Sequence, residues 1–237
     1  MAARRTQKGF TLVEIAIVLV IIGLLLGGIL KGQELITSAR VRNIADQNSG
    51  IQAAYYGFID RYRQVPGDWP TANAVQAIPG VTSGGDGSGR LDGTQPWTEA
   101  LAVWEHLSKA GFIQGNYTGG SAAPTAADTD KAPRNAFQGF LVLFETDDYA
   151  NDTGTPPVRL NLILGRGIPV NVLRELDVKV DDGFPTTGVL RQALTTGATF
   201  SANNIGHSSA ACVDGTATPI IWNIAGNEQA CNAVYVY

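Results

Sequence analysis

Histidine and cysteine are scarce in this sequence, and the common catalytic motifs are missing. There are two histidines, His106 and His207, and no Gly-x-Ser-x-Gly, His-Glu-x-x-His or P-loop pattern. The two cysteines form no Cys-x-x-Cys pair, which gives little support to a zinc site or a thioredoxin-like redox site. We therefore do not expect an enzyme.

Clustered positive charge is also missing beyond Arg42. The net charge is −4, and three of the cations, Arg4, Arg5 and Lys8, lie within the first nine residues. The rest of the chain is therefore more acidic than the total suggests. Because contacts to phosphates need clustered lysine and arginine, we expect no nucleic acid among the partners.

The two cysteines, Cys212 and Cys231, both lie late in the chain. In an exported domain, such a pair closing a loop of about 20 residues predicts a disulfide that stabilises the fold by roughly 3 kcal/mol. In a cytosolic protein, the same two residues would be free buried thiols. The compartment decides between these two interpretations.

Charge is almost absent from one long apolar run. Between Phe10 and Leu30 the only charged residue is Glu14. At ~1.5 Å per residue, this run makes a helix of about 31 Å, which matches the hydrocarbon core of a bilayer. The basic residues before it should stay in the cytoplasm, so the remainder should face the periplasm or the exterior.

Three interpretations of this run compete. A cleaved secretory signal has a shorter apolar region, of about 7–15 residues, and Thr37-Ser38-Ala39 is a poor cleavage site. A plain signal anchor fits the hydropathy but leaves Glu14 unexplained. A carboxylate inside lipid costs several kcal/mol unless it is paired, so the third interpretation makes Glu14 functional. The alternative for Glu14 is a side chain that reaches water at the membrane edge.

The segment Lys8-Gly9-Phe10-Thr11-Leu12-Val13-Glu14-Ile15 resembles the processing site of type IV prepilins and type II secretion pseudopilins. The resemblance covers roughly residues 4–40. It implies that residues 1–9 are a leader peptide, that prepilin peptidase cuts between Gly9 and Phe10, and that the new amine of Phe10 is N-methylated. It also implies that Glu14 meets the amine of a neighbouring subunit during assembly, a pairing that would be strong in low dielectric and would set the axial register.

A helical rhythm continues beyond the apolar run. Ile44, Ile51, Tyr55, Phe58 and Tyr62 fall on one face, and no proline occurs before Pro66. We therefore expect a long helix over residues 10–63, with a transmembrane half over residues 10–30, and a globular head over residues 64–237. Pilins often carry a proline near the position of Lys31; this chain has none there, so we expect no kink of that kind.

The head mixes one or two short helices with strand-like runs. Pro96 should begin a helix that buries Trp97, Leu101, Trp104 and Leu107 and ends at Gly111, with His106 near its surface. Residues 170–176 suit a second short helix. Strands are predicted at residues 137–144, 158–164, 220–224 and 234–237. This order predicts an α+β fold with an antiparallel sheet against the long helix, as in pilins.

Calcium is the one cofactor for which the sequence offers ligands; otherwise we expect none. Asp86 and Asp92 flank glycines in Asp86-Gly-Ser-Gly-Arg-Leu-Asp92, an oxygen-rich spacing that hard cations favour. Asp181 and Asp182, with Asp177, form a second acidic cluster. Some pseudopilins bind calcium in their heads. The alternative at both places is an ordinary Asp-Gly turn.

The sequence therefore predicts a structural subunit of a type IV pilus or a type II secretion pseudopilus. Its expected partners are identical or related pilin subunits, prepilin peptidase and the assembly machinery. We expect it in the bacterial inner membrane with a periplasmic head, and later in a periplasmic or extracellular filament. The alternative is a low-abundance minor pilin or adhesin whose head binds a surface or ligand. A membrane-anchored enzyme would need a pocket with clustered titratable groups.

Overall fold

One long helix begins the described part of the chain. The computed structural model describes residues 12–237, so the predictions for Gly9 and Phe10 lie outside the described residues. Helix α1 runs without interruption over Leu12–Tyr62. It ends where Arg63 adopts a left-handed backbone, φ 55°, and donates its N–H to the carbonyl of Ile59 at 2.8 Å. The predicted end near Arg63 is confirmed, and the helix continues through Lys31.

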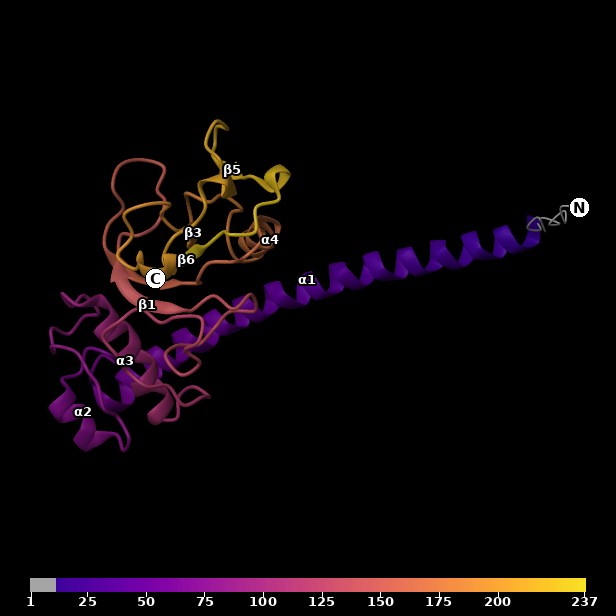
Figure 1. Ribbon diagram of the computed structural model, residues 1–237. Coiled ribbons are helices and arrows are strands. Elements are labelled where there is room, and N and C mark those ends of the chain that lie inside the picture. Colours follow the sequence, from indigo (N-terminus) through magenta and orange to yellow (C-terminus); the bar gives the residue numbers. More distant parts are fainter. Residues whose placement is uncertain (1–11) are drawn as a thin grey trace, which may run out of the picture. The chain divides into compact units, whose positions relative to one another are not determined.

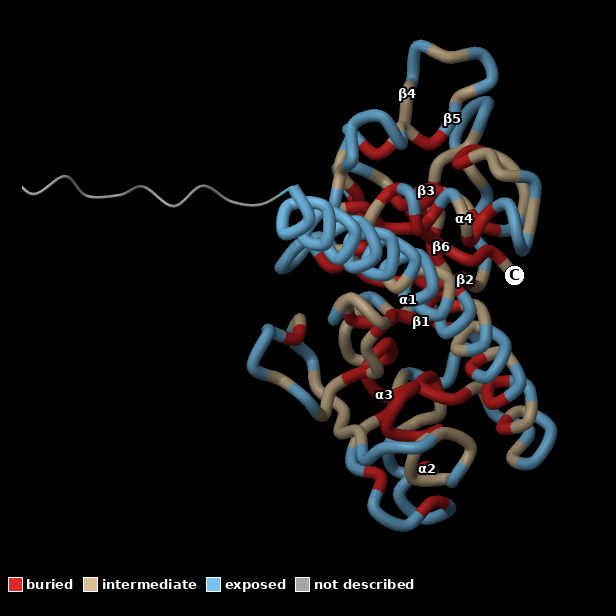
Figure 2. The backbone as a smooth tube through the Cα atoms, turned by 90° about the vertical axis from the view of Figure 1, so that its right-hand side faces the viewer, coloured by how far each residue is buried: buried red, intermediate tan, exposed pale blue. Residues whose placement is uncertain are grey.

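The chain divides into two compact units, residues 1–40 and 41–237. In the described part of the first unit, large apolar side chains are exposed, among them Leu12 at 91% and Leu24 at 73%. Figure 2 shows this exposure along the first turns of α1. Among the residues that the structure describes, one helix, Leu12–Tyr62, is long and apolar enough to cross a membrane. None of its most apolar stretch is buried within the chain.

The second unit contains a four-stranded antiparallel sheet (Figure 1). Its strands, in spatial order, are β1 (Val142–Thr146), β2 (Arg159–Ile163), β6 (Ala233–Val236) and β3 (Leu190–Gln192). Tyr235 of β6 stands opposite Leu162 on one side and Leu190 on the other. A separate small hairpin joins β4 (Val213–Asp214) to β5 (Ile221–Trp222). The α+β fold with an antiparallel sheet is confirmed, although β3 was not predicted.

Short helices cover and connect these strands. They are α2 (Thr71–Ala77), α3 (Pro96–Lys109), α4 (Val170–Val180) and the 3-10 turns η1 (Ala202–Asn204), η2 (Ala210–Cys212) and η3 (Ile224–Gly226). Helix α3 packs against β1, and Pro96 stands at its first position as predicted. Just beyond its end, Gly111 has φ +80°, a conformation that suits glycine because it lacks a Cβ atom.

The second half of α1 lies in the hydrophobic core of the head. Ile44, Ile51, Tyr55 and Phe58, four of the five residues on the predicted face, are buried there together with residues of α3, α4 and the sheet. Tyr237 follows β6, and its hydroxyl donates a hydrogen bond to Asn48 Oδ1 of α1 at 2.5 Å. From Val41 onward, the helix is therefore an integral part of the head.

Candidate functional site

The first turns of α1 present the predicted assembly residue. Glu14 lies in the first turn, in an exposed position, where the positive end of the helix dipole favours a carboxylate. Apolar side chains surround it in sequence, and Leu12, Ile17 and Leu24 are each more than half exposed. This half of the helix therefore offers an apolar surface with one acidic group near its start.

Three glycines interrupt this surface. At Gly23, Gly27 and Gly28, an added Cβ atom would meet nothing within 4 Å among the described residues. Each glycine costs about 1 kcal/mol relative to alanine in a helix interior. No close contact within the described residues accounts for these glycines.

Residues 4–30 match the family model described as the prokaryotic N-terminal methylation motif. The chain carries the N-terminal signature of type IV pilins and pseudopilins. This pilin-like motif belongs to structural subunits that prepilin peptidase processes and that assemble with other pilin subunits. Together with the apolar helix, it fits a precursor anchored in the inner membrane. A search of the curated proteins finds no match to the chain.

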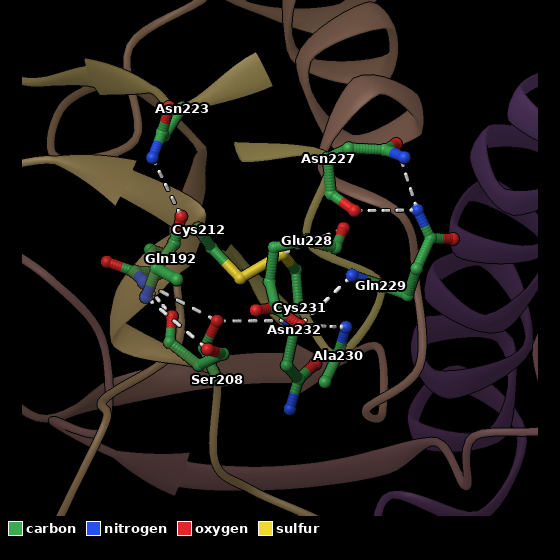
Figure 3. The surroundings of a disulfide bond; sticks show 12 residues. Gln192, Ser208, Cys212, Asn223, Asn227, Glu228, Gln229, Ala230, Cys231 and Asn232 are labelled. Carbon is green, nitrogen blue, oxygen red and sulfur yellow. Dashed lines mark hydrogen bonds between the residues drawn. A yellow bond between two sulfur atoms is a disulfide. The ribbon is translucent and has the colours of Figure 1, made fainter. Parts of the chain in front are cut away.

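The disulfide expected between Cys212 and Cys231 is present in the head (Figure 3). Both cysteines are buried, and their Cα atoms lie 5.8 Å apart. The bond ties η2 to the segment that leads into β6. Gln192 of β3 supports the same region, because its Nε2 donates to the carbonyl of Ser209 at 3.2 Å. The disulfide thus anchors a long loop to the centre of the sheet.

The first predicted acidic loop is organised by Asp68, which was not among the predicted ligands. The buried carboxylate of Asp68 accepts backbone hydrogen bonds from Gly87 at 2.9 Å, Ser88 at 3.0 Å and Gly89 at 2.8 Å. A glycine-rich loop exposes many N–H groups, and such a concave group of donors favours an anion. The signal available in the sequence was an acid placed directly after the Pro66-Gly67 turn.

The acidic residues that lie together at this loop differ from the predicted pair, Asp86 and Asp92. Asp86 is brought together with Asp68 and Glu99, whose ligand oxygens all lie within 4.8 Å of one another. Asp92 does not belong to this group; it accepts a hydrogen bond from Ser88 Oγ at 3.1 Å. Burial raises the pKa of Glu99, and nearby Asp68 and Asp86 raise it further. A divalent cation bound by oxygen ligands would relieve this repulsion.

The second acidic group does bring Asp181 and Asp182 together, with Asp177. Their oxygens already hold the turn that follows α4. Asp181 accepts from the backbone of Leu190 at 3.1 Å, and Asp182 accepts from the backbone of Phe184 at 2.9 Å. These bonds give direct support to the turn interpretation at this place.

The prediction that His106 lies near the surface is wrong, because His106 is fully buried. Its Nδ1 accepts the N–H of Gly67 at 2.9 Å, so its Nε2 donates to the carbonyl of Ser83 at 2.8 Å. Burial lowers the pKa of His106 and favours this neutral form. Helical periodicity missed the burial because the partners are backbone groups of a distant loop.

The neighbouring Glu105 completes this arrangement. Its carboxylate accepts hydrogen bonds from the backbone N–H groups of Thr82 and Ser83, each at 3.0 Å, and from both hydroxyl groups. His207, the other histidine, accepts the N–H of Ala198 at 3.2 Å in a different loop. Both histidines therefore hold loop backbone in place.

Proposed function

We propose that this chain is a structural subunit of a type IV pilus or a type II secretion pseudopilus. In this proposal, prepilin peptidase removes residues 1–9, the amine of Phe10 is N-methylated, and the subunit waits in the inner membrane with its head in the periplasm. The assembly machinery then moves it into a filament, where the apolar halves of neighbouring helices pack together and the heads lie outside.

The observation that carries the proposal is the exposed apolar half of α1 within a chain that has the methylation motif. Burying apolar surface is worth roughly 25 cal/mol per Å². The described residues leave that stretch of α1 uncovered, although the second half of the same helix lies in a well-packed core. Lipid before assembly and like helices after assembly would each cover it.

Glu14 gives the filament its register in this proposal. A carboxylate among apolar helices is costly unless a cation compensates it. Cleavage after Gly9 would create an amine at Phe10, and the amine of one subunit would reach Glu14 of the next. Staggered helices would then be fixed at one axial offset, because only that offset pairs the two charges.

A variant that lacks the charge of Glu14 tests the role of this residue in filament assembly apart from any role in membrane insertion. We expect Glu14→Gln to insert into the membrane and to be processed normally, but to give few filaments. Glu34→Gln is the matched control, because Glu34 lies on the same helix beyond the apolar run and pairs with Lys31 at 2.7 Å. The measurements are membrane fractionation, the mass of the processed chain, and filament yield after shearing. A filament yield equal to that of the unmutated chain would refute the register role.

A low-abundance minor pilin or adhesin is the second candidate. It is favoured by the loop-rich head, where long segments outside the sheet enclose a pocket with two arginines, Arg134 and Arg166, in its lining. Abundance distinguishes the two functions: a major subunit dominates sheared filaments, whereas a tip subunit or adhesin is rare in them.

A further inference from the structure

The pocket with Arg134 and Arg166 in its lining is a concave opening of about 490 Å³ on the head. It lies among three loops that are distant in sequence. Its lining consists of Pro124, Thr125, Ala126, Arg134, Gln138, Gly139, Phe140, Arg166, Asn203 and Ile205. The volume falls within the range of about 300–1,000 Å³ that is usual for sites binding small molecules.

A buried asparagine, Asn135, holds together two of the segments that line the pocket. Asn135 Nδ2 donates to the carbonyl of Leu164 at 2.6 Å, and its Oδ1 accepts from the backbone of Gly139 at 3.0 Å. Gly139 lies so close to the Gly165–Arg166 backbone that an added Cβ atom would be 2.5 Å from the carbonyl oxygen of Arg166. Two loops are thus locked together, which fixes the backbone that carries Arg166.

Arg134 is fixed within the lining. Its guanidinium carbon lies 4.2 Å from the centre of the Phe140 ring, and its Nη2 donates to the carbonyls of Ala126 at 3.0 Å and Asp128 at 2.7 Å. These contacts use one of the two terminal nitrogens. The remaining N–H donors belong to a side chain that is already ordered, so a ligand would bind it with little further loss of conformational freedom.

Arg166 has a different role in the lining. Among the described residues, its half-buried side chain makes no hydrogen bond or ion pair, and no acidic residue lines the pocket. Hydrogen bonds from Thr125 N at 2.7 Å and Oγ1 at 2.8 Å lower the pKa of the nearby Asp128, and the charges of Lys131 and Arg134 lower it further. Asp128 therefore partly balances the charge of Arg134, whereas Arg166 has no acidic partner among the described residues.

We propose that this pocket binds a small organic anion. Its carboxylate or phosphate group would be bound by Arg166 and by the free donors of Arg134, because a guanidinium matches either group with two parallel hydrogen bonds. The remainder of the ligand would lie against Phe140 and Ile205, with polar contacts from Gln138 and Thr125. The proposal goes beyond filament assembly and does not depend on it.

The test measures binding to the full processed chain in a non-ionic detergent by calorimetry. Three probes share a sugar ring: glucuronate carries a carboxylate, glucose 6-phosphate carries a phosphate, and glucose carries neither. We expect saturable binding of at least one of the two anions and none of glucose. The tighter of the two anions identifies the acidic group that the pocket prefers. Affinity should also fall as salt is raised.

Arg166→Gln should weaken binding of the preferred anion by about 10- to 100-fold, the usual effect of losing hydrogen bonds to a charged group. It should leave the melting temperature without ligand unchanged, since the Arg166 side chain has no bonding partner among the described residues. Arg174→Gln is the matched control, because Arg174 is an exposed arginine of α4 outside the pocket. Binding of neither anion, or binding that Arg166→Gln leaves intact, would overturn the proposal.

Discussion

Trp222 of β5 donates a 2.7 Å hydrogen bond from its indole Nε1 to Oδ2 of Asp177 on α4. Both residues are buried, and Asp177 Oδ1 also accepts the backbone N–H of Gly183 at 3.3 Å. The contact joins α4 to the hairpin within the loop that the disulfide closes. Burial raises the pKa of Asp177 from 3.8 to about 7, despite the two hydrogen bonds that act in the opposite direction.

This raised pKa predicts a pH-dependent stability. The folded chain holds the proton of Asp177 more tightly than the unfolded chain does, so its contribution to stability is complete below pH 3.8 and is lost as the pH rises through about 7. Asp177→Asn keeps an acceptor for Trp222 but does not titrate. We expect the unmutated chain to lose roughly 1–2 kcal/mol relative to this variant between pH 4 and pH 8, allowing for solvent screening. Urea unfolding at several pH values measures it, and parallel profiles for the two chains would show that Asp177 does not titrate as stated.

Glu105 should be the most costly acidic residue to remove from α3. Its buried carboxylate holds the loop at Thr82 and Ser83, so Glu105→Ala leaves several donors without their acceptor. We expect a loss of about 2–3 kcal/mol in the free energy of unfolding. The control Glu175→Ala removes a partly exposed carboxylate that pairs with Lys179 at 2.6 Å, and it should cost under about 1 kcal/mol. Equal losses in the two variants would contradict the role given to Glu105.

The sequence predicted those parts of the fold that follow from local periodicity. We could predict the buried face of α1 at Ile44 and Phe58 and the start of α3 at Pro96. Each of these features depends on residues that are close in the sequence. β3 was missed because Leu190–Gln192 is too short to show an alternating pattern, and its pairing with β6 lies far away in sequence.

At the candidate sites too, contacts between residues that are distant in the sequence could not be predicted. The disulfide was predictable for an exported head, because only two cysteines exist and one pairing is available to them within the chain. The partners of Asp86 were not predictable: Asp68 and Glu99 meet it only after the glycine-rich loop folds back over α3. Likewise, the burial of His106 depends on the backbone groups of Gly67 and Ser83, which no helical pattern reveals.

Loss of the disulfide should destabilise the head. The bond closes a loop with a sequence separation of 19 residues, and a loop of this size contributes about 3 kcal/mol in the chain-entropy model. We expect the double variant Cys212→Ser, Cys231→Ser to have a free energy of unfolding lower by about 3 kcal/mol. Its urea unfolding midpoint should fall accordingly. Reductant should destabilise the unmutated chain and leave the double variant unchanged. A similar response of both chains to reductant would contradict this account.

The mature N-terminus can be read directly by mass spectrometry. We expect a chain that begins at Phe10 and carries one N-methyl group. Gly9→Ala should slow processing mildly, whereas a bulkier residue, as in Gly9→Leu, should block it more strongly. A first residue other than Phe10 would refute the predicted cleavage, and equal processing of both variants would refute the requirement for a small residue at position 9.

Calcium binding can be assigned to residues by comparing two variants. If the cation binds at the group formed by Asp68, Asp86 and Glu99, Glu99→Gln should weaken calcium affinity at least tenfold, and Asp92→Asn should leave it nearly unchanged. Calorimetric titration of the full processed chain with calcium measures both. The opposite order would favour the pair Asp86 and Asp92 that the sequence suggested, and no binding by the unmutated chain would exclude calcium from the loop.

The position of β6 in the sheet makes the end of the chain necessary for the head to fold. This strand is the last of the sheet in chain order, yet it lies between β2 and β3 and supplies the pairing edge for both. Until residues 233–236 are present, β3 has no neighbour in the sheet and the hydroxyl of Tyr237 cannot reach Asn48. If the head is exported as proposed, a subunit would remain vulnerable to proteases until translocation reached these residues. Stop codons shortly before β6 should therefore be as damaging as much larger deletions.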